Sequence, residues 1–164
     1  MKKFKNISLF LFAAVAMTVL TSCDDMVADE LQGHWYGEVA TANFSYHRGI
    51  NIDYQEVEIY FDKGPGNNAS GTGIEIDYEN NGWYYTECPF TFNVRDGIIY
   101  MDYEDGTHVA IKDYSIHEDV NNGDMYTFQG VFVDYYTGRE MAQFKLYKRG
   151  DYYYNDKTYN WRKR

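Results

Sequence analysis

Apolar and polar residues alternate with a period of two along most of the chain beyond residue 30. Such alternation is typical of β-strands that bury one face and leave the other in water. We therefore expect Glu75 and Asp77 to face solvent, because they alternate with the apolar side chains of their stretch. The apolar members of four stretches are Val57, Ile59 and Phe61; Ile74, Ile76 and Tyr78; Phe90, Phe92 and Val94; Ala142, Phe144 and Leu146.

Clusters of Gly, Asn and Asp separate these stretches, and Asn-Gly and Asp-Gly pairs tolerate the positive φ angles of hairpin turns. The clusters are Lys63–Asn68, Asn80–Gly82, Arg95–Gly97, Glu104–Gly106, Asn121–Gly123 and Thr137–Gly138. They divide the chain into eight predicted strands, and no long amphipathic helix is expected. The predicted strands cover residues 34–46, 54–62, 71–79, 83–94, 97–103, 107–113, 124–134 and 140–148.

Short turns between successive strands favour antiparallel pairing of sequence neighbours, which gives a meander. A meander with one apolar face closes naturally into a barrel, and closure also removes exposed edges. The sequence therefore predicts an all-β domain over residues 31–149, an eight-stranded antiparallel up-and-down barrel. A two-sheet sandwich is the alternative. It would need Greek-key crossovers, and only the predicted loop Ser45–Asp53 is long enough to suggest one.

The first 22 residues differ from the rest of the chain. Lys2, Lys3 and Lys5 precede the apolar run Ile7–Leu20, which is shorter than the roughly 20 residues that span a membrane. A cationic start followed by such a run is typical of a secretory signal peptide, which we assign to residues 1–22.

The sequence Leu20-Thr21-Ser22-Cys23 resembles the lipobox of bacterial lipoproteins. This resemblance implies cleavage before Cys23, acylation of its thiol by diacylglycerol, often a further palmitate-like chain on its amino group, and a lipidated linker over residues 23–30. Two or three acyl chains suffice for stable anchoring in a membrane. An uncleaved N-terminal anchor is the alternative. Acidic residues after the Cys resemble an inner-membrane retention signal of enterobacteria or a surface-export signal of Bacteroidota. We expect the lipid anchor to lie in the outer membrane and assign it to neither the periplasmic nor the surface-facing leaflet.

Charge and cysteine content narrow the function classes. The 164 residues include 25 Asp or Glu and 15 Lys or Arg, for a net charge of −10, which argues against nucleic acid as a partner. If Cys23 is acylated, Cys88 has no disulfide partner. Cys88 shares its strand face with Phe90 and Phe92, so we expect a buried, inert thiol.

The predicted first strand carries Leu31-Gln32-Gly33-His34-Trp35-Tyr36-Gly37-Glu38, which resembles the Gly-x-Trp opening of lipocalins and related calycin barrels. With eight strands and Arg149 closing the last, the order is similar to that of the small lipocalin-like lipoproteins of Bacteroidota, over Leu31–Arg149. In lipocalins the Trp closes one barrel end from inside and an Arg packs over it. The resemblance thus implies that Trp35 is a plug and Arg149 its lid. It implies a fold and an anchor but no activity.

Candidate chemistry is sparse. The four His residues and the two Cys lack metal-ligand spacing, so neither a metal nor another cofactor is expected. No Ser lies in a Gly-x-Ser-x-Gly motif. The carboxylate pairs Glu56/Glu58 and Glu75/Asp77 are expected on solvated strand faces, and no catalytic residue is assigned.

The 18 tyrosines are the unusual feature of the composition. Tyr84, Tyr85, Tyr135 and Tyr136 fall near predicted turns, where exposed rings suit carbohydrate stacking or protein contacts. Shielding of strand ends is the alternative. The aromatic and basic C-terminal tail, residues 150–164, is expected to lie across the barrel mouth or to fray.

Three functions follow from these observations. The first is a non-enzymatic, lipid-anchored envelope protein that binds a small apolar or carbohydrate ligand at the barrel mouth. The second is an envelope lipoprotein with a filled barrel that docks a protein partner, and the third is an unrecognised hydrolase. Large inward side chains would fill a narrow barrel and favour a small or absent cavity. These are Phe61, Phe90, Phe92, Phe128, Phe132 and Phe144.

Overall fold

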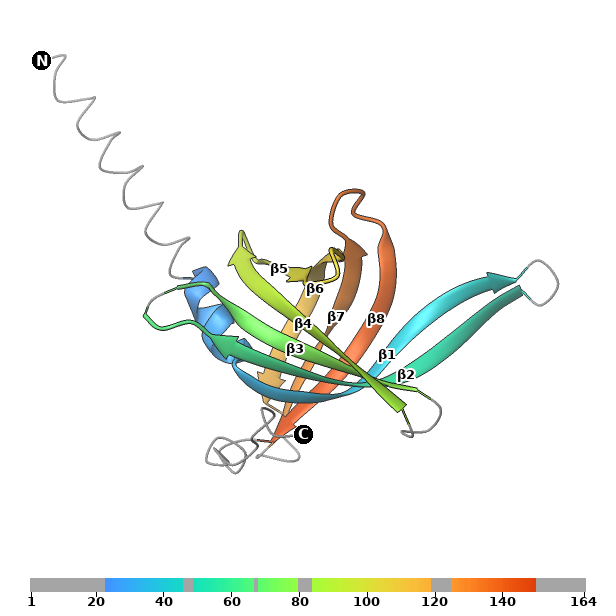
Figure 1. Cartoon of the computed structure of the whole chain (residues 1–164), viewed down its shortest axis with the longest axis horizontal. Coiled ribbons are helices and arrows are strands. Elements are labelled where there is room, and N and C mark those ends of the chain that lie inside the picture. Colours follow the sequence, from blue (N-terminus) through green and yellow to red (C-terminus); the bar gives the residue numbers. More distant parts are fainter. Residues whose placement is uncertain (1–22, 46–48, 67, 80–83, 119–124, 150–164) are drawn as a thin grey trace, which may run out of the picture.

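The protein, seen in a computed structural model, is described over residues 23–45, 49–66, 68–79, 84–118 and 125–149. A short helix over residues 23–31 precedes the strands. Each strand pairs antiparallel with the next, and β1 also pairs with β8, which closes the barrel (Figure 1). The predicted up-and-down barrel is therefore confirmed, and the sandwich is wrong. The strands are β1 (Gly33–Ser45), β2 (Gly49–Lys63), β3 (Ser70–Glu79), β4 (Tyr84–Arg95), β5 (Ile98–Tyr103), β6 (His108–Glu118), β7 (Met125–Asp134) and β8 (Glu140–Arg149).

Two strands are longer than predicted, while the other six agree to within one residue at each end. β2 begins at Gly49, so most of the predicted loop Ser45–Asp53 is paired strand. β6 continues to Glu118 through an irregularity between Lys112 and Ser115. Asp113 has a φ of 49° there, a conformation that Asp tolerates better than most residues, and a bulge of this kind lets a strand bend and continue.

The hairpin of β1 and β2 extends beyond the barrel. The two strands pair along the whole length of β1, but β1 pairs with β8 only over Tyr36–Ala40, and β2 pairs with β3 only over Val57–Lys63. Residues 41–45 and 49–56 therefore form a two-stranded ribbon, called the arm here, which projects to the right in Figure 1.

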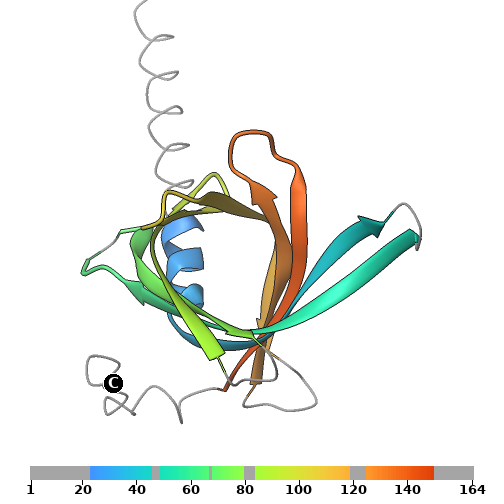
Figure 2. The same cartoon turned by 45° about the vertical axis from the view of Figure 1, so that its right-hand side comes forward.

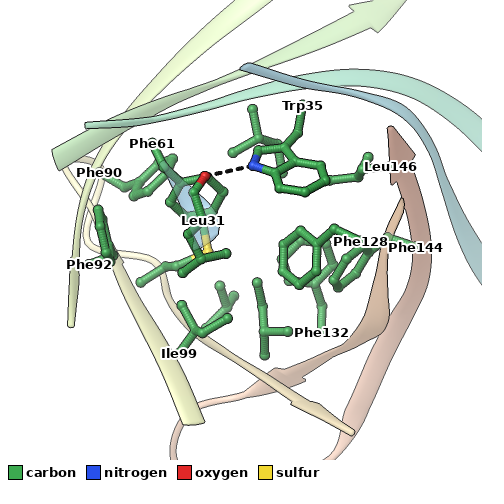
Figure 3. Packing of buried hydrophobic residues seen from close by; sticks show 14 of the residues in the cluster. Leu31, Trp35, Phe61, Phe90, Phe92, Ile99, Phe128, Phe132, Phe144 and Leu146 are labelled. Atoms are coloured by element: carbon green, nitrogen blue, oxygen red, sulfur yellow. Dashed lines mark hydrogen bonds between the residues drawn. The ribbon is translucent and has the colours of Figure 1, made fainter. Parts of the chain in front are cut away.

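Apolar side chains fill the barrel interior (Figure 3). The Trp35 ring packs edge-on against Phe128, with centroids 5.3 Å apart, and Phe128 packs edge-on against Phe144 at 4.8 Å. On the opposite wall, Phe61 contacts the rings of Phe90 and Phe92. All six phenylalanines predicted to point inward are buried, so the barrel has a packed core.

The segment predicted as a linker, residues 23–30, is a helix that lies within one end of the barrel (Figure 2). Its sequence places Val27, Ala28 and Leu31 on one side, and Ala28 and Leu31 are fully buried in the core. Burial of this apolar stripe explains why a short segment becomes helical. We call this end, which also contains the β4–β5 turn, the closed end, and the opposite end, with the β5–β6 and β7–β8 turns, the far end.

The apolar residues of β3 face outward, and the prediction for this strand is wrong. Gly73 pairs with Phe61 and Phe90, both of which lie in the interior, so Gly73 shares the inward face. A Cβ atom on Gly73 would lie 2.2 Å from Cζ of Phe90, so glycine alone leaves room for that ring. Strand alternation then points Glu75 and Asp77 into the barrel, the reverse of the expected orientation.

Candidate functional site

Trp35 lies at the closed end, with no exposed surface. Its Nε1 donates a hydrogen bond to the carbonyl oxygen of Leu31 at 2.6 Å, which joins the first strand to the helix (Figure 3). The cation over the indole ring is Lys148, whose Nζ lies 4.4 Å from the ring centroid. The side chain of Arg149, predicted for this role, lies outside the described part of the structure.

Three carboxylates tie the helix to the closed end. The Asp24 carboxylate accepts hydrogen bonds from the backbone N–H groups of Asp96 and Gly97 in the β4–β5 turn, at 3.1 and 3.0 Å. Nζ of Lys63, at the end of β2, lies 2.7 Å from Oδ1 of Asp25 and 2.6 Å from Oδ1 of Asp29. Cys23, the residue before Asp24, is exposed at the start of the helix.

Tyr135 and Tyr136 belong to an aromatic cluster at the far end. Their centroids lie 5.0 Å apart at an interplanar angle of 72°, and Tyr136 is 74% exposed. Tyr100 of β5 packs edge-on against Tyr135, and His108 of β6 packs edge-on against Tyr136, at 5.3 and 5.7 Å. These four residues form what we call the far-end cluster. Neither Tyr100 nor His108 was predicted, because they join the tyrosines only through cross-strand pairing.

The far-end cluster is held in place by polar contacts. Oδ1 of Asp134 accepts hydrogen bonds from the backbone N–H and the hydroxyl of Thr137, at 2.7 and 2.6 Å, which fixes the β7–β8 turn and lowers the pKa of Asp134. Nδ1 of His108 lies 2.6 Å from Oδ1 of Asp102. The rings are therefore presented on a rigid turn beside groups that can donate and accept hydrogen bonds.

Tyr84 and Tyr85 also lie at the far end, on the β3–β4 side, and are 68% and 54% exposed. In an eight-stranded ring, that hairpin stands diametrically opposite the β7–β8 hairpin. The four predicted tyrosines therefore share one end of the barrel but form two separate groups.

A partly buried polar cluster that the sequence did not predict lies on the inner face of the β3–β5 wall. Tyr103 of β5 donates a hydrogen bond to Oε2 of Glu75. Burial raises the pKa of Glu75 to about 7, against the effect of this hydrogen bond, and the neighbouring Asp77 raises it further through charge and a shared hydrogen bond. Burial also raises the pKa of Tyr103. The signal in the sequence was Gly71-Thr72-Gly73, whose glycines mark the inward face of β3.

Cys88 pairs with Glu75 in the register of β3 and β4 and is half-buried. Burial raises the pKa of its thiol, and the charges of Asp77, Glu75 and Asp105 add to the effect. A thiolate is the nucleophilic form of cysteine, so these surroundings disfavour reactivity.

A second polar cluster covers the outer face of β1–β3. Nε2 of His34 lies 2.9 Å from Oε2 of Glu58, and the hydroxyls of Tyr60 and Tyr78 donate to the same carboxylate at 2.9 and 2.7 Å. These contacts, the one from His34 first, lower the pKa of Glu58 to about 2. The His34 ring stacks on Tyr60 at 4.1 Å. These contacts between the four side chains link β1, β2 and β3 on the outer face of the barrel.

Within the residues that the structure describes, no group of three His, Cys, Asp or Glu side chains could hold a metal ion. No helix in the described ranges has the length and apolarity to cross a membrane. The signal peptide and the C-terminal tail predicted from the sequence lie outside those ranges. No protein-family model and no curated protein matches this sequence.

Proposed function

We propose that the protein is a lipid-anchored binding protein of the bacterial cell envelope, acylated on Cys23, that catalyses no reaction. One observation carries the proposal. The helix that begins at Cys23 is fixed in the closed end, whereas Tyr135 and Tyr136 of the far-end cluster expose their rings on the β7–β8 turn at the other end. We therefore assign anchoring to the closed end of the barrel and binding to the far end. The lipid anchor is proposed to lie in the outer membrane.

The ligand class that suits the far-end cluster is carbohydrate. Exposed aromatic faces stack on the apolar faces of sugar rings, and the neighbouring His108–Asp102 pair offers hydrogen-bond partners for hydroxyl groups. A small apolar ligand inside the barrel is less favoured, because the rings of Trp35, Phe128 and Phe144 occupy the interior.

Absence of catalysis is proposed from the chemistry of the groups that could act as nucleophile or base. The raised pKa of Cys88 disfavours its thiolate. The Glu58 carboxylate is saturated by His34, Tyr60 and Tyr78. The Glu75–Asp77 pair has one carboxyl with a pKa of about 7 and is the group that a hydrolase alternative would need.

A glycan array probed with the lipid-free barrel tests the ligand class. Wild-type protein should bind a defined set of glycans, and Tyr136→Ala should lower the affinity by about tenfold or more, as for a central aromatic contact. Tyr54→Ala on the arm removes a similarly exposed ring and is the matched control. Absence of glycan binding, or equal loss in both variants, would exclude the far-end cluster as a sugar site. Glycan or ester turnover abolished by Glu75→Gln would instead establish an enzyme.

A filled barrel also supports the second candidate, docking of a protein partner. The arm is the observation that favours it, because it lies outside the barrel and none of its described side chains belongs to the core.

A further inference from the structure

Part of the barrel wall beside the far-end cluster is buried although it faces away from the interior. Ala110 of β6 lies between Val109 and Ile111, which both belong to the core, so strand alternation points Ala110 outward. Ala110 and its cross-strand partner Val133 are nevertheless only 1% and 3% exposed. The rings of the far-end cluster lie beside this small apolar patch, because Tyr100 is the partner of Ala110 on the other side.

Two basic residues lie on the same outer face, one on each side of β5. Arg95 of β4 is the cross-strand partner of Ile98. Since Ile99 pairs with Ile111, the same register places Lys112 on the other side of Ile98. Neighbouring strands are about 4.8 Å apart, so the Cα atoms of Arg95 and Lys112 are separated by roughly 10 Å.

Both basic side chains reach toward the aromatic rings. Cζ of Arg95 lies 5.1 Å from the centroid of the Tyr100 ring, and a hydrogen bond between these two side chains raises the pKa of Arg95. Nζ of Lys112 lies at the β7–β8 turn, 3.9 Å from the position that a Cβ atom on Gly138 would take. Because this turn also carries Tyr135, the rings have a cation on the side of β4 and another at the turn.

Neither cation is neutralised by an ion pair in the described part of the chain. None of the ion pairs found there includes Arg95 or Lys112. The charge of Asp96 raises the pKa of Arg95 without such a contact, and Asp102, which borders the cluster, is held by His108. The whole chain has a net charge of −10, so these cations are a local exception that favours an anionic ligand.

The combination of rings and cations suits one class of ligand. Exposed aromatic faces stack on sugar rings, and the guanidinium group binds carboxylate or sulfate oxygens through paired N–H donors. A neutral glycan would use the rings but leave both cations without a partner. A sugar ring that carries an anionic group would use both features.

We propose that the glycan bound at the far-end cluster is acidic, and that a carboxylate or sulfate group on one of its rings is bound between Arg95 and Lys112 while the glycan packs on the exposed rings of Tyr135 and Tyr136. This inference rests on the proposed glycan binding and specifies the chemical class of the glycan. It assigns specificity to two side chains of neighbouring strands that the tyrosine pattern alone does not include.

Four trisaccharides in two matched pairs test the proposal by calorimetric titration of the protein in a neutral detergent. The first pair is a galacturonic acid trisaccharide and its carboxyl-reduced form. The second is a sulfated galactose trisaccharide and its desulfated form. In at least one pair, the wild type should bind the acidic member about tenfold or more tighter, and the pair that shows this preference identifies the anion. Added salt should reduce the preference, because exposed charges are screened.

Substitutions connect this preference to the two cations. Arg95→Gln and Lys112→Gln should each weaken binding of the acidic member, by about tenfold when combined, and should affect the neutral member much less. Tyr136→Ala should weaken binding of both members. Lys145→Gln is the matched control, because it also removes a cation that lies over a tyrosine ring, with Nζ 5.5 Å from the centroid of Tyr147, and it should keep the preference.

Three results would overturn the inference. They are failure to bind either acidic trisaccharide, binding of the neutral member as tightly as the acidic one in both pairs, and an equal loss of preference in Lys145→Gln. Tight binding of a neutral member that is lost in Tyr136→Ala would retain glycan binding at the far-end cluster and remove only its acidic specificity. Failure of the proposed function itself would instead show as absence of binding to every glycan of the array.

Discussion

Lys148 lies over the Trp35 ring and, at the same time, caps the helix. Its Nζ donates hydrogen bonds to the carbonyl oxygens of Glu30 and Gln32, at 2.8 and 2.9 Å, where the helix ends. A cation is favourable at this end of a helix because the carbonyl groups there carry partial negative charge. Burial lowers the pKa of Lys148 to about 8, so the side chain remains mainly protonated at neutral pH.

Removing either partner should loosen the closed end. Trp35→Ala should lower the free energy of unfolding by about 3–5 kcal/mol, as for a large buried aromatic residue. Lys148→Met keeps the aliphatic stem but leaves two carbonyl oxygens without their donor, which should cost about 1–3 kcal/mol. Lys145→Ala, at an exposed position of β8, is the control and should stay within about 0.5 kcal/mol in urea unfolding. A Trp35→Ala variant as stable as this control would contradict the packing described.

Stability should depend on the proton of Glu75. Its pKa is raised from 4.5 to about 7 in the folded protein, so the folded state binds this proton more tightly than the unfolded state. The stabilisation is then complete below about pH 4.5 and is lost as the pH rises through 7, by up to about 3 kcal/mol. Glu75→Gln should flatten the pH dependence of the free energy of unfolding over this range. Glu87→Gln, on the exposed face of β4, should leave it unchanged.

The inward face of β3 can be tested at Gly73. Gly73→Ala places a methyl group against the Phe90 ring and the backbone carbonyl of Tyr60, and such overpacking should destabilise the barrel by about 1–3 kcal/mol. Thr72→Ala, on the neighbouring exposed position, should have little effect in the same thermal unfolding experiment. If Gly73→Ala destabilises the protein less than Thr72→Ala does, the inward orientation of Gly73 described above is wrong.

Acylation of Cys23 is tested by Cys23→Ser. The variant should fail to incorporate labelled palmitate and should leave the membrane fraction, because the thiol is the proposed site of lipid attachment. Cys88→Ser keeps the lipobox and should remain in the membrane. Retention of Cys23→Ser in the membrane with an uncut leader would identify an uncleaved anchor instead.

The alternation of apolar and polar residues predicted the number and pairing of the strands, but not which face of β3 points inward. Ile74 and Ile76 were the obvious inward candidates, yet the rings of Phe90 and Phe92 lean over Gly73 and Gly71 and take that volume. The face of a strand is decided by its neighbours, so one strand's own pattern is not sufficient. The inward, partly buried position of Glu75 was missed for the same reason.

The helix was missed for a related reason. Residues 23–31 are too few for a helix to be stable alone, and their propensity gave little signal. Their helical form depends on burial of Ala28 and Leu31 against strands that come later in the chain. Likewise, Lys148 was overlooked as the partner of Trp35 because strand alternation and the path of the helix, rather than the sequence motif, bring it to the ring.

The helix leaves no slack between Cys23 and the barrel. A flexible linker of seven residues would let a domain wander over roughly 15 Å, and its attached surfaces would sample many orientations. Asp24, bonded to the β4–β5 turn, removes that freedom from the first residue onward. A barrel acylated at Cys23 would be held at a fixed height above the bilayer surface and at a fixed tilt. Its reach toward ligands would come from lateral diffusion of the lipids rather than from motion of a tether.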